Sequence, residues 1–399
     1  MVFSENHRSD PTPATYSEST FAFLDRAAGA YWERIQALIE AWFGRFCPEE
    51  ASHLRSRLRS HDEQHFRGAF WELYCHETLC RLNYEVTCHP DVGTGRRPDF
   101  LATQGSGRLL VEATVTSDSA ADVAAKHRED QVYDALNRLN SPNFYLALQV
   151  ENVGSESPSA AKLRPKLESW LQSLDPDELA EQISLDGTLL LSPRAPAFEW
   201  REGGWKIRFL PIPKKPEARG QPGARPIGMH GPASAFIVDD KEPIRRAVTE
   251  KSNSYGSTGL PFAVALNTHS FSPDDHDVID ALFGSEQVTI TANADGTTGY
   301  EASRALDGVW FGRHGVQNRR VSAVLVAHNL APWNILTNVP TLWHHPDADH
   351  PITVGDVPWR QAKIDSSSGK PSFTPPTVSL PEFFGLEQEW PGPEDPFPD

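Results

Sequence analysis

An apolar stretch at positions 108–115, with the sequence RLLVEATV, constrains the fold of this chain more than any other feature. Glu112 is flanked by a nearly continuous apolar run, Leu109, Leu110, Val111, Ala113 and Val115, which is typical of a strand covered on both faces. Such strands lie in sheets that carry helices on each face. A carboxylate there is either protonated or matched with a cation, because a lone buried charge is costly. The stretch therefore predicts a layered α/β protein and marks Glu112 as a candidate site residue.

The segments around this stretch indicate the order helix, three strands, helix, strand. The spacing of apolar residues assigns a helix at 64–82, strands at 84–89, 98–103 and 108–115, a helix at 120–139, and strands at 143–150 and 261–267. Two hairpin steps followed by a helical crossover predict an α/β fold with a mixed central sheet flanked by helices. Both helices are expected to pack against this sheet, which the last strand is expected to complete.

Further segments are expected on both sides of this core. The predicted organisation is a flexible tail at 1–20, an N-terminal helical segment at 21–62, a core at 63–270 with an insertion at about 154–204, a mixed C-terminal α/β extension at 271–365, and a Pro-rich acidic tail at 366–399. The extension contains a hairpin pattern in QVTITANADGTTGYEA and a clear strand pattern in RRVSAVLVAH. These boundaries follow changes in composition and in apolar spacing.

The balance of charges limits what the chain can bind. Its 399 residues include 54 acidic and 37 basic side chains, which gives a net charge of −17. This argues against a protein that coats nucleic acid without specificity, because such proteins need a basic surface. A local basic patch stays open, and one loop offers Lys214, Lys215, Arg219 and Arg225. A solvated surface loop is the alternative.

Other features favour a cytoplasmic protein with reduced thiols and no membrane partner. No stretch approaches the roughly 18 apolar residues of a membrane span, and the polar N-terminus lacks the apolar segment of a signal peptide. The four cysteines form no C-x-x-C pair. Cys75 and Cys80 would lie about 140° apart around a helix, which is poor geometry for one metal ion. The spacing therefore favours buried thiols over structural zinc.

Two further acids lie in positions that suit a metal site. Asp99 follows Pro98 at the start of the strand beside 108–115, and carboxylates on neighbouring strands can share a divalent ion. Glu72 lies in a helical stripe of small or apolar residues made of Gly68, Ala69, Cys75 and Leu79. Each acid also has an ordinary explanation, since helical glutamates are mostly solvated or paired and aspartate is common after proline in turns.

Taken together, these residues resemble the PD-(D/E)xK nuclease superfamily, and its restriction-endonuclease-like members in particular. The matching residues are Glu72, Pro98-Asp99 and Glu112-Ala113-Thr114, and the resemblance covers about residues 63–150. It implies a Mg²⁺-dependent (or Mn²⁺-dependent) endonuclease that hydrolyses phosphodiester bonds of DNA or RNA, in restriction or anti-phage defence. It also implies that Asp99, Glu112 and Glu72 hold the metal and act in catalysis.

One position departs from the superfamily pattern. Thr114 stands where the resemblance calls for a lysine that helps to position the attacking water. In some members this role moves to the following helix, where Lys126 is our choice and His127 and Gln131 come next. A surface lysine without this role is the alternative for Lys126.

Partners follow from the same resemblance. We expect nucleic acid, with DNA ahead of RNA, and leave a second copy of the chain or another protein open as an additional partner. Arg96 and Arg97 are expected to contact the phosphate backbone, unless they belong to a solvated turn. Histidines at 89, 269, 344, 345 and 350 are weaker candidates for a transition-metal site.

Two other functions compete with the nuclease. A module of nuclease fold could bind nucleic acid or a protein partner without cleaving, since Thr114 carries no charge and the chain is acidic. An unrelated α/β protein would make the pairing of Asp99 with Glu112 coincidental. The separation of these two carboxylates in the folded chain distinguishes the last reading from the others.

Overall fold

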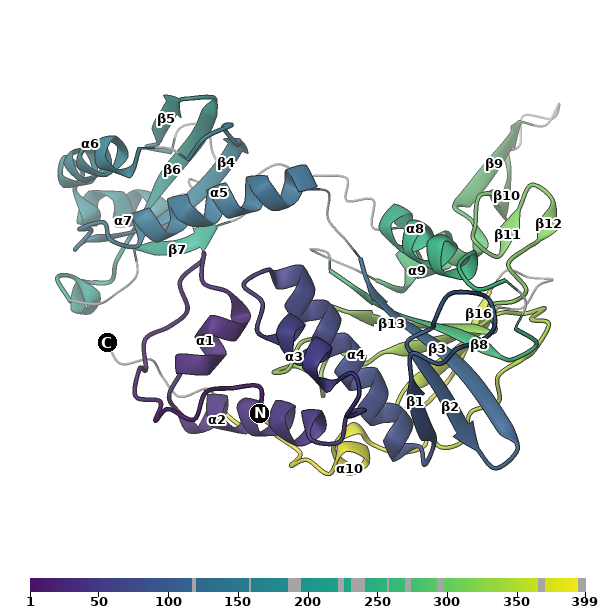
Figure 1. The fold of residues 1–399 in the computed structure, drawn as a ribbon. Coiled ribbons are helices and arrows are strands. Elements are labelled where there is room, and N and C mark those ends of the chain that lie inside the picture. Colours follow the sequence, from purple (N-terminus) through teal and green to yellow (C-terminus); the bar gives the residue numbers. More distant parts are fainter. Residues whose placement is uncertain are drawn as a thin grey trace. The chain divides into compact units, whose positions relative to one another are not determined.

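The computed structural model describes residues 1–116, 120–157, 159–185, 195–221, 226–230, 241–256, 258–269, 274–292, 298–364 and 370–393. The chain forms two compact units (Figure 1). The first unit contains Met1–Pro11, Ser19–Ser117 and Val238–Pro396, and the second contains Thr12–Glu18, Asp118–Ile237 and Phe397–Asp399. The second unit is therefore inserted into the first, and the insertion is much larger than the predicted 154–204.

The first unit is built on an eight-stranded mixed sheet in the order β1-β2-β3-β8-β13-β14-β15-β16. Its strands are β1 (Glu85–Cys88), β2 (Phe100–Gln104), β3 (Gly107–Val115), β8 (Phe262–Thr268), β13 (Ala323–His328), β14 (Thr341–His344), β15 (Arg360–Ile364) and β16 (Pro371–Thr374). Strands β1, β2 and β3 are antiparallel neighbours, whereas β8 pairs in parallel with both β3 and β13. The three predicted neighbouring strands and the completing strand are confirmed.

Strands β13 to β15 correct the predicted C-terminal extension. They continue the same sheet, so residues 271–365 are not an addition to a finished core. The physical reason is that the sequence AVLVAH of β13 is buried along almost its whole length and needs neighbours on both edges, which β8 and β14 provide.

Helices cover the two faces of this sheet. Successive side chains of a strand point to opposite faces. Leu110 of β3 packs in a buried cluster with Ile244 and Val248 of α8 (Lys241–Ser252) and with residues of α9 (Asp275–Phe283). Val115, on the other face of β3, lies near Gly68 of α4 (Glu63–Arg81). The predicted helix at 64–82 thus packs on the sheet as expected.

The two chain ends are more ordered than the predicted tails. Helices α1 (Thr20–Arg26), α2 (Ala30–Phe43) and α3 (Ala51–Leu58) precede α4, and α10 (Leu380–Phe384) lies near the other end of the chain. The backbone nitrogens of Val2 and Phe3 both donate to Glu40 at 2.7 Å. Near the C-terminus, the ring of Phe384 lies 5.3 Å from that of Trp42. Residues near the N-terminus are thus held to α2 by backbone hydrogen bonds to Glu40, and Phe384 of α10 is held to α2 by its packing on Trp42.

The second unit has its own sheet, in the order β5-β6-β4-β7. Its elements are α5 (Ala120–Leu136), β4 (Phe144–Asn152), α6 (Ala160–Gln172), α7 (Pro176–Leu185), β5 (Phe198–Glu202), β6 (Trp205–Pro213), the 3₁₀ turn η2 (Pro216–Ala218) and β7 (Ile227–His230). Val132 and Leu136 of α5 pack in the core of this unit with Leu146 of β4. The prediction that the helix at 120–139 packs against the first sheet is therefore wrong.

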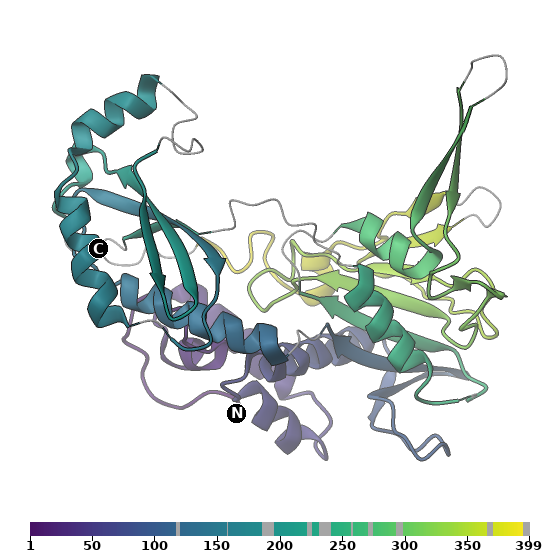
Figure 2. The same ribbon diagram turned by 90° about the horizontal axis from the view of Figure 1, so that it is seen from above.

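Smaller sheets complete the described part of the first unit. The predicted hairpin is confirmed as β9 (Glu286–Ala292) paired with β10 (Thr298–Arg304), and Figure 2 shows it extending from the unit. Residues 293–297 between them lie outside the described residues. A short pair is formed by β11 (Phe311–Gly312) and β12 (Gly315–Val316). Among the described residues, no helix combines the length and the apolar character that crossing a membrane requires.

Candidate functional site

The fold brings Asp99 and Glu112 together on adjacent strands. Phe100 pairs with Val111, so Asp99, which comes directly before β2, lies opposite Glu112 of β3. The Ala113 backbone nitrogen donates to Asp99 Oδ2 at 2.7 Å, and the Asp99 backbone nitrogen donates to Glu112 Oε2 at 3.2 Å. These reciprocal bonds hold each carboxylate in a fixed relation to the backbone of the neighbouring strand.

The environment of Asp99 is rich in negative charge. Burial raises the pKa of Asp99 well above its usual range, and the nearby carboxylates of Glu112 and Glu72 raise this pKa further. The bond from the Ala113 backbone and the charge of Lys251 oppose this rise only in part. A bound cation would relieve the same electrostatic strain, because an opposite charge favours the ionised carboxylate.

Glu112 is held by two donors that the sequence analysis did not identify. Lys251 Nζ donates to Glu112 Oε1 at 2.6 Å, and the Tyr255 hydroxyl donates to Oε2 at 2.6 Å. Burial and the Glu112 carboxylate both raise the pKa of Tyr255, so its hydroxyl stays protonated and able to donate. Both carboxylate oxygens of this 4 % exposed residue therefore have partners.

A sequence signal for Lys251 exists in hindsight. In α8 the buried positions Ile244 and Val248 are followed by Lys251 at helical spacing, so this lysine lies on the apolar side of an amphipathic helix. A lysine at such a position reaches toward the protein rather than away from it. The sequence alone did not reveal that α8 packs beside β3.

Glu72, Asp99 and His89 form a second cluster around the Asp99 carboxylate. Each offers one oxygen or nitrogen atom, and these atoms all lie within 4.8 Å of one another. His89 follows β1 directly and has a positive φ of 46°, which is uncommon outside glycine. Its backbone nitrogen donates to the Asp99 carbonyl at 2.9 Å, and its Nδ1 lies 3.9 Å from Asp99 Oδ1.

This cluster could hold a divalent cation. Two carboxylates with an imidazole suit Mn²⁺ or another transition metal, while Mg²⁺ prefers oxygen ligands throughout. Glu72 also accepts a hydrogen bond from Arg57 of α3, which a metal would share or displace. Glu112 borders the cluster through its bond to the Asp99 backbone, and His89 is an additional ligand candidate beyond the three predicted acids.

The other predicted site residues lie as follows. Lys126 is an exposed residue of α5 in the second unit, where it contacts Asp130 one turn further on. Arg96 and Arg97 are exposed in the loop between β1 and β2, and Arg96 Nη1 lies 3.3 Å from Ser254 Oγ. Thr114 is half-buried on β3. The structure therefore brings Glu72, Asp99 and Glu112 together within the first unit.

Several weaker candidates have other partners in the structure. Lys214, from the basic loop, is only 3 % exposed and donates to the Ser141 carbonyl at 3.0 Å, so it does not contribute to a basic surface. His344 contacts Gln361 at 2.8 Å, and His345 contacts the Gln317 carbonyl at 3.0 Å. Burial lowers the pKa of both histidines.

The expectation of four reduced thiols is wrong. Cys47 and Cys88 form a disulfide with an S–S distance of 2.02 Å, while Cys75 and Cys80 are free. The two bonded cysteines are 41 residues apart in sequence. Their approach depends on how the segment after α2 packs beside the end of β1, which spacing along the chain does not reveal.

Comparison with known proteins gives no match to this chain, whether with models of protein families, with curated proteins or with solved structures.

Proposed function

We propose that this chain is a divalent-metal-dependent nuclease that hydrolyses phosphodiester bonds of DNA or RNA. The observation that carries the proposal is the pairing of Asp99 and Glu112 across β2 and β3, with Glu72 beside Asp99 and Lys251 on Glu112. Acids on a helix and two adjacent strands, with a lysine close by, are what the resemblance to the PD-(D/E)xK superfamily calls for. A restriction-endonuclease-like core would then consist of α4, β1, β2, β3, α8 and β8.

In this core α8 takes the place that the sequence analysis gave to α5. Strand β8 is parallel to β3, and the helix that directly precedes β8 in the chain is α8. The second unit is inserted between β3 and this helix. In the proposed core, the helix that follows the acid-bearing strand β3 is thus α8, and its lysine bonded to Glu112 is Lys251. Lys126 stays a prediction that the experiment below tests alongside it.

The residues around Asp99 fit a metal ion. Burial and the nearby carboxylates of Glu112 and Glu72 raise the pKa of Asp99, and Glu72, His89 and Asp99 supply three ligand atoms. A Mn²⁺ or Mg²⁺ ion bound there would activate water and neutralise charge at the scissile phosphate. Lys251 would place a positive charge beside this site, Tyr255 would hold Glu112 in position, and Arg96 and Arg97 would contact neighbouring phosphates.

We place this activity in the cytoplasm and favour a role in restriction or anti-phage defence. A second function has one observation in its favour. The family lysine is replaced by Thr114, so a nuclease-fold module that binds nucleic acid or a protein partner without cleaving is the alternative.

The metal centre is tested by calorimetric titration with Mn²⁺ and Mg²⁺. Asp99→Asn should lose most of the metal affinity of the wild type because it removes a charged ligand. Asp91→Asn is the matched control, since Asp91 is an exposed aspartate in the loop that leads to Asp99. Unchanged affinity in Asp99→Asn would contradict the proposed centre.

Cleavage is measured on single- and double-stranded DNA and on RNA, with either metal. Lys251→Met should lower the rate by roughly two to four powers of ten while metal affinity is retained. Lys126→Met should have little effect if Lys251 has the catalytic role, and the opposite result would restore the original assignment. A wild type that binds these nucleic acids and cleaves none of them would favour the binding module.

A further inference from the structure

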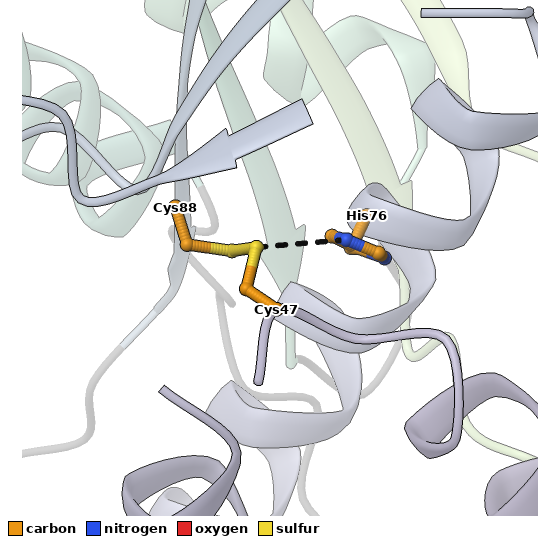
Figure 3. Close-up of side chains that lie close together, drawn as sticks. All are labelled: Cys47, His76 and Cys88. Atoms are coloured by element: carbon orange, nitrogen blue, oxygen red, sulfur yellow. Dashed lines mark hydrogen bonds between the residues drawn. A yellow bond between two sulfur atoms is a disulfide. The ribbon is translucent and has the colours of Figure 1, made fainter. Parts of the chain in front are cut away.

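A group of sulfur and nitrogen atoms lies beside the acidic site but separate from it. Figure 3 shows the disulfide between Cys47, which follows α2, and Cys88, the last residue of β1, with the ring of His76 from α4 directed at it. His76 Nε2 lies 3.8 Å from Cys47 Sγ. One ligand atom from each of these three residues lies within 4.8 Å of the other two.

A fourth candidate ligand comes from the same helix. Cys80 lies one turn after His76, and its Sγ is 3.8 Å from Nδ1 and 3.9 Å from Nε2 of the ring. Among the described residues, neither free cysteine of α4, Cys75 or Cys80, belongs to the three-residue group within 4.8 Å, but Cys80 contacts the His76 ring.

The distances from His76 Nε2 to the sulfurs of Cys47 and Cys80 resemble that between a nitrogen and a sulfur ligand of one zinc ion. With Zn–S of about 2.3 Å and Zn–N of about 2.0–2.1 Å, tetrahedral coordination places a nitrogen and a sulfur ligand roughly 3.6 Å apart. The two shorter sulfur distances from His76 Nε2 are 3.8 and 3.9 Å. His76 is only 2 % exposed and packs between the rings of Phe46 and Phe100, which would shield a bound ion from water.

We propose that Cys47, His76, Cys80 and Cys88 form a zinc site in the reduced protein and that the disulfide is the oxidised state of this site. Three cysteines and one histidine are a common ligand set of structural zinc sites. Such an ion would tie the segment between α2 and α3 to α4 and to the end of β1. Cytosolic thiols are kept reduced, so the metal-bound state is the one expected inside a cell.

Conversion of the disulfide state into the reduced state requires a dithiol reductant. The reductant supplies two electrons and two protons, its own sulfurs become a disulfide, and Cys47 and Cys88 become thiols. Binding of Zn²⁺ then displaces the protons of the coordinating thiols into solvent, because thiolates are the ligands. Oxidation by a disulfide-bearing compound reverses the first step and releases the ion.

The test uses Co²⁺ and Zn²⁺ on the full-length chain before and after reduction. The reduced wild type should bind one ion with thiolate-to-cobalt charge-transfer bands and the visible bands of a tetrahedral site, and Zn²⁺ should displace the cobalt. The oxidised wild type should show none of these bands. Because both measurements use the same polypeptide, the comparison does not depend on a variant that folds poorly.

Variants then assign the ligands. Cys80→Ser should lower the Zn²⁺ affinity of the reduced chain at least about tenfold. Cys75→Ser is the matched control on the same helix and should leave the affinity unchanged. Asp99→Asn should keep the thiolate bands, which separates this site from the proposed nuclease centre. The absence of thiolate bands in the reduced wild type would overturn the proposal, as would equal losses in Cys75→Ser and Cys80→Ser.

Discussion

Replacing Lys251 by methionine should destabilise the first unit by about 2 kcal/mol. The side chain of Glu112 is only 5 % exposed, that of Lys251 is 30 % exposed, and the two are joined by a 2.6 Å bond. A hydrogen bond to a charged group contributes about 1.5–3 kcal/mol, and loss of one partner of a fully buried ion pair costs about 3–5 kcal/mol. Solvent reaches Lys251, so the lower range applies. Methionine keeps the apolar stem of the side chain and removes only its charge.

The assay is equilibrium unfolding in urea with a metal chelator present. Lys126→Met is the matched control, because the Lys126 side chain is 63 % exposed and pairs with Asp130 one turn further along the same helix, and such i,i+4 pairs contribute about 0.3–0.5 kcal/mol. A double-mutant cycle of Lys251→Met with Glu112→Gln should give a coupling free energy of about 1–2 kcal/mol. A coupling below about 0.5 kcal/mol, or equal losses from the two lysines, would refute the reasoning.

Three further predictions concern charge and the independence of the two units. Because the pKa of Asp99 is raised, its ionisation opposes folding above the pH at which the unfolded carboxyl titrates. Asp99→Asn should therefore raise the melting temperature of the protein in chelator at pH 7. The same variant should abolish any rise in melting temperature on adding Mn²⁺. Burial lowers the pKa of His76 to about 4, so this residue costs the oxidised, metal-free protein no stability above about pH 6.5, where it is neutral in both the folded and the unfolded chain. By pH 5 the unfolded chain takes up a proton that the folded chain does not, so the free energy of unfolding should fall by about 2 kcal/mol. Denaturant titrations at both pH values should show a smaller loss for His76→Gln. Leu146→Ala should destabilise the second unit by about 2–5 kcal/mol, since this side chain is fully buried, yet leave the Mn²⁺ affinity within twofold of wild type by calorimetry; a large loss of affinity would show that the metal centre depends on the second unit.

Local patterns were sufficient to predict the part of the sheet that carries the acids. The helix at 64–82 and the three strands after it have clear periodicities and short connections, and sequential strands joined by tight turns usually pair. The register that places Asp99 opposite Glu112 follows from that hairpin. Glu72 could be predicted to face inward because its helical stripe is small and apolar.

The remainder of the site depends on contacts that local patterns do not determine. Periodicity shows that α5 has an apolar face but not which sheet this face covers, so α5 was assigned to the first sheet although it buries Val132 in the second. Lys251 and Tyr255 reach Glu112 across sequence separations of 139 and 143 residues. The Cys47–Cys88 disulfide was missed for the same reason, because it joins segments whose spacing resembles no known metal or redox motif.

The insertion of the second unit between β3 and α8 also sets the order in which the site can assemble during synthesis. Lys251 follows Glu112 by 139 residues, so at about 5–20 residues per second it leaves the ribosome roughly 7–28 s later. Throughout this interval β3 lacks its parallel neighbour β8. The second unit can already fold, because its core lies within residues 118–237 apart from Tyr16. Under the proposed function, the acids of the site would therefore lack the Lys251 charge throughout this interval.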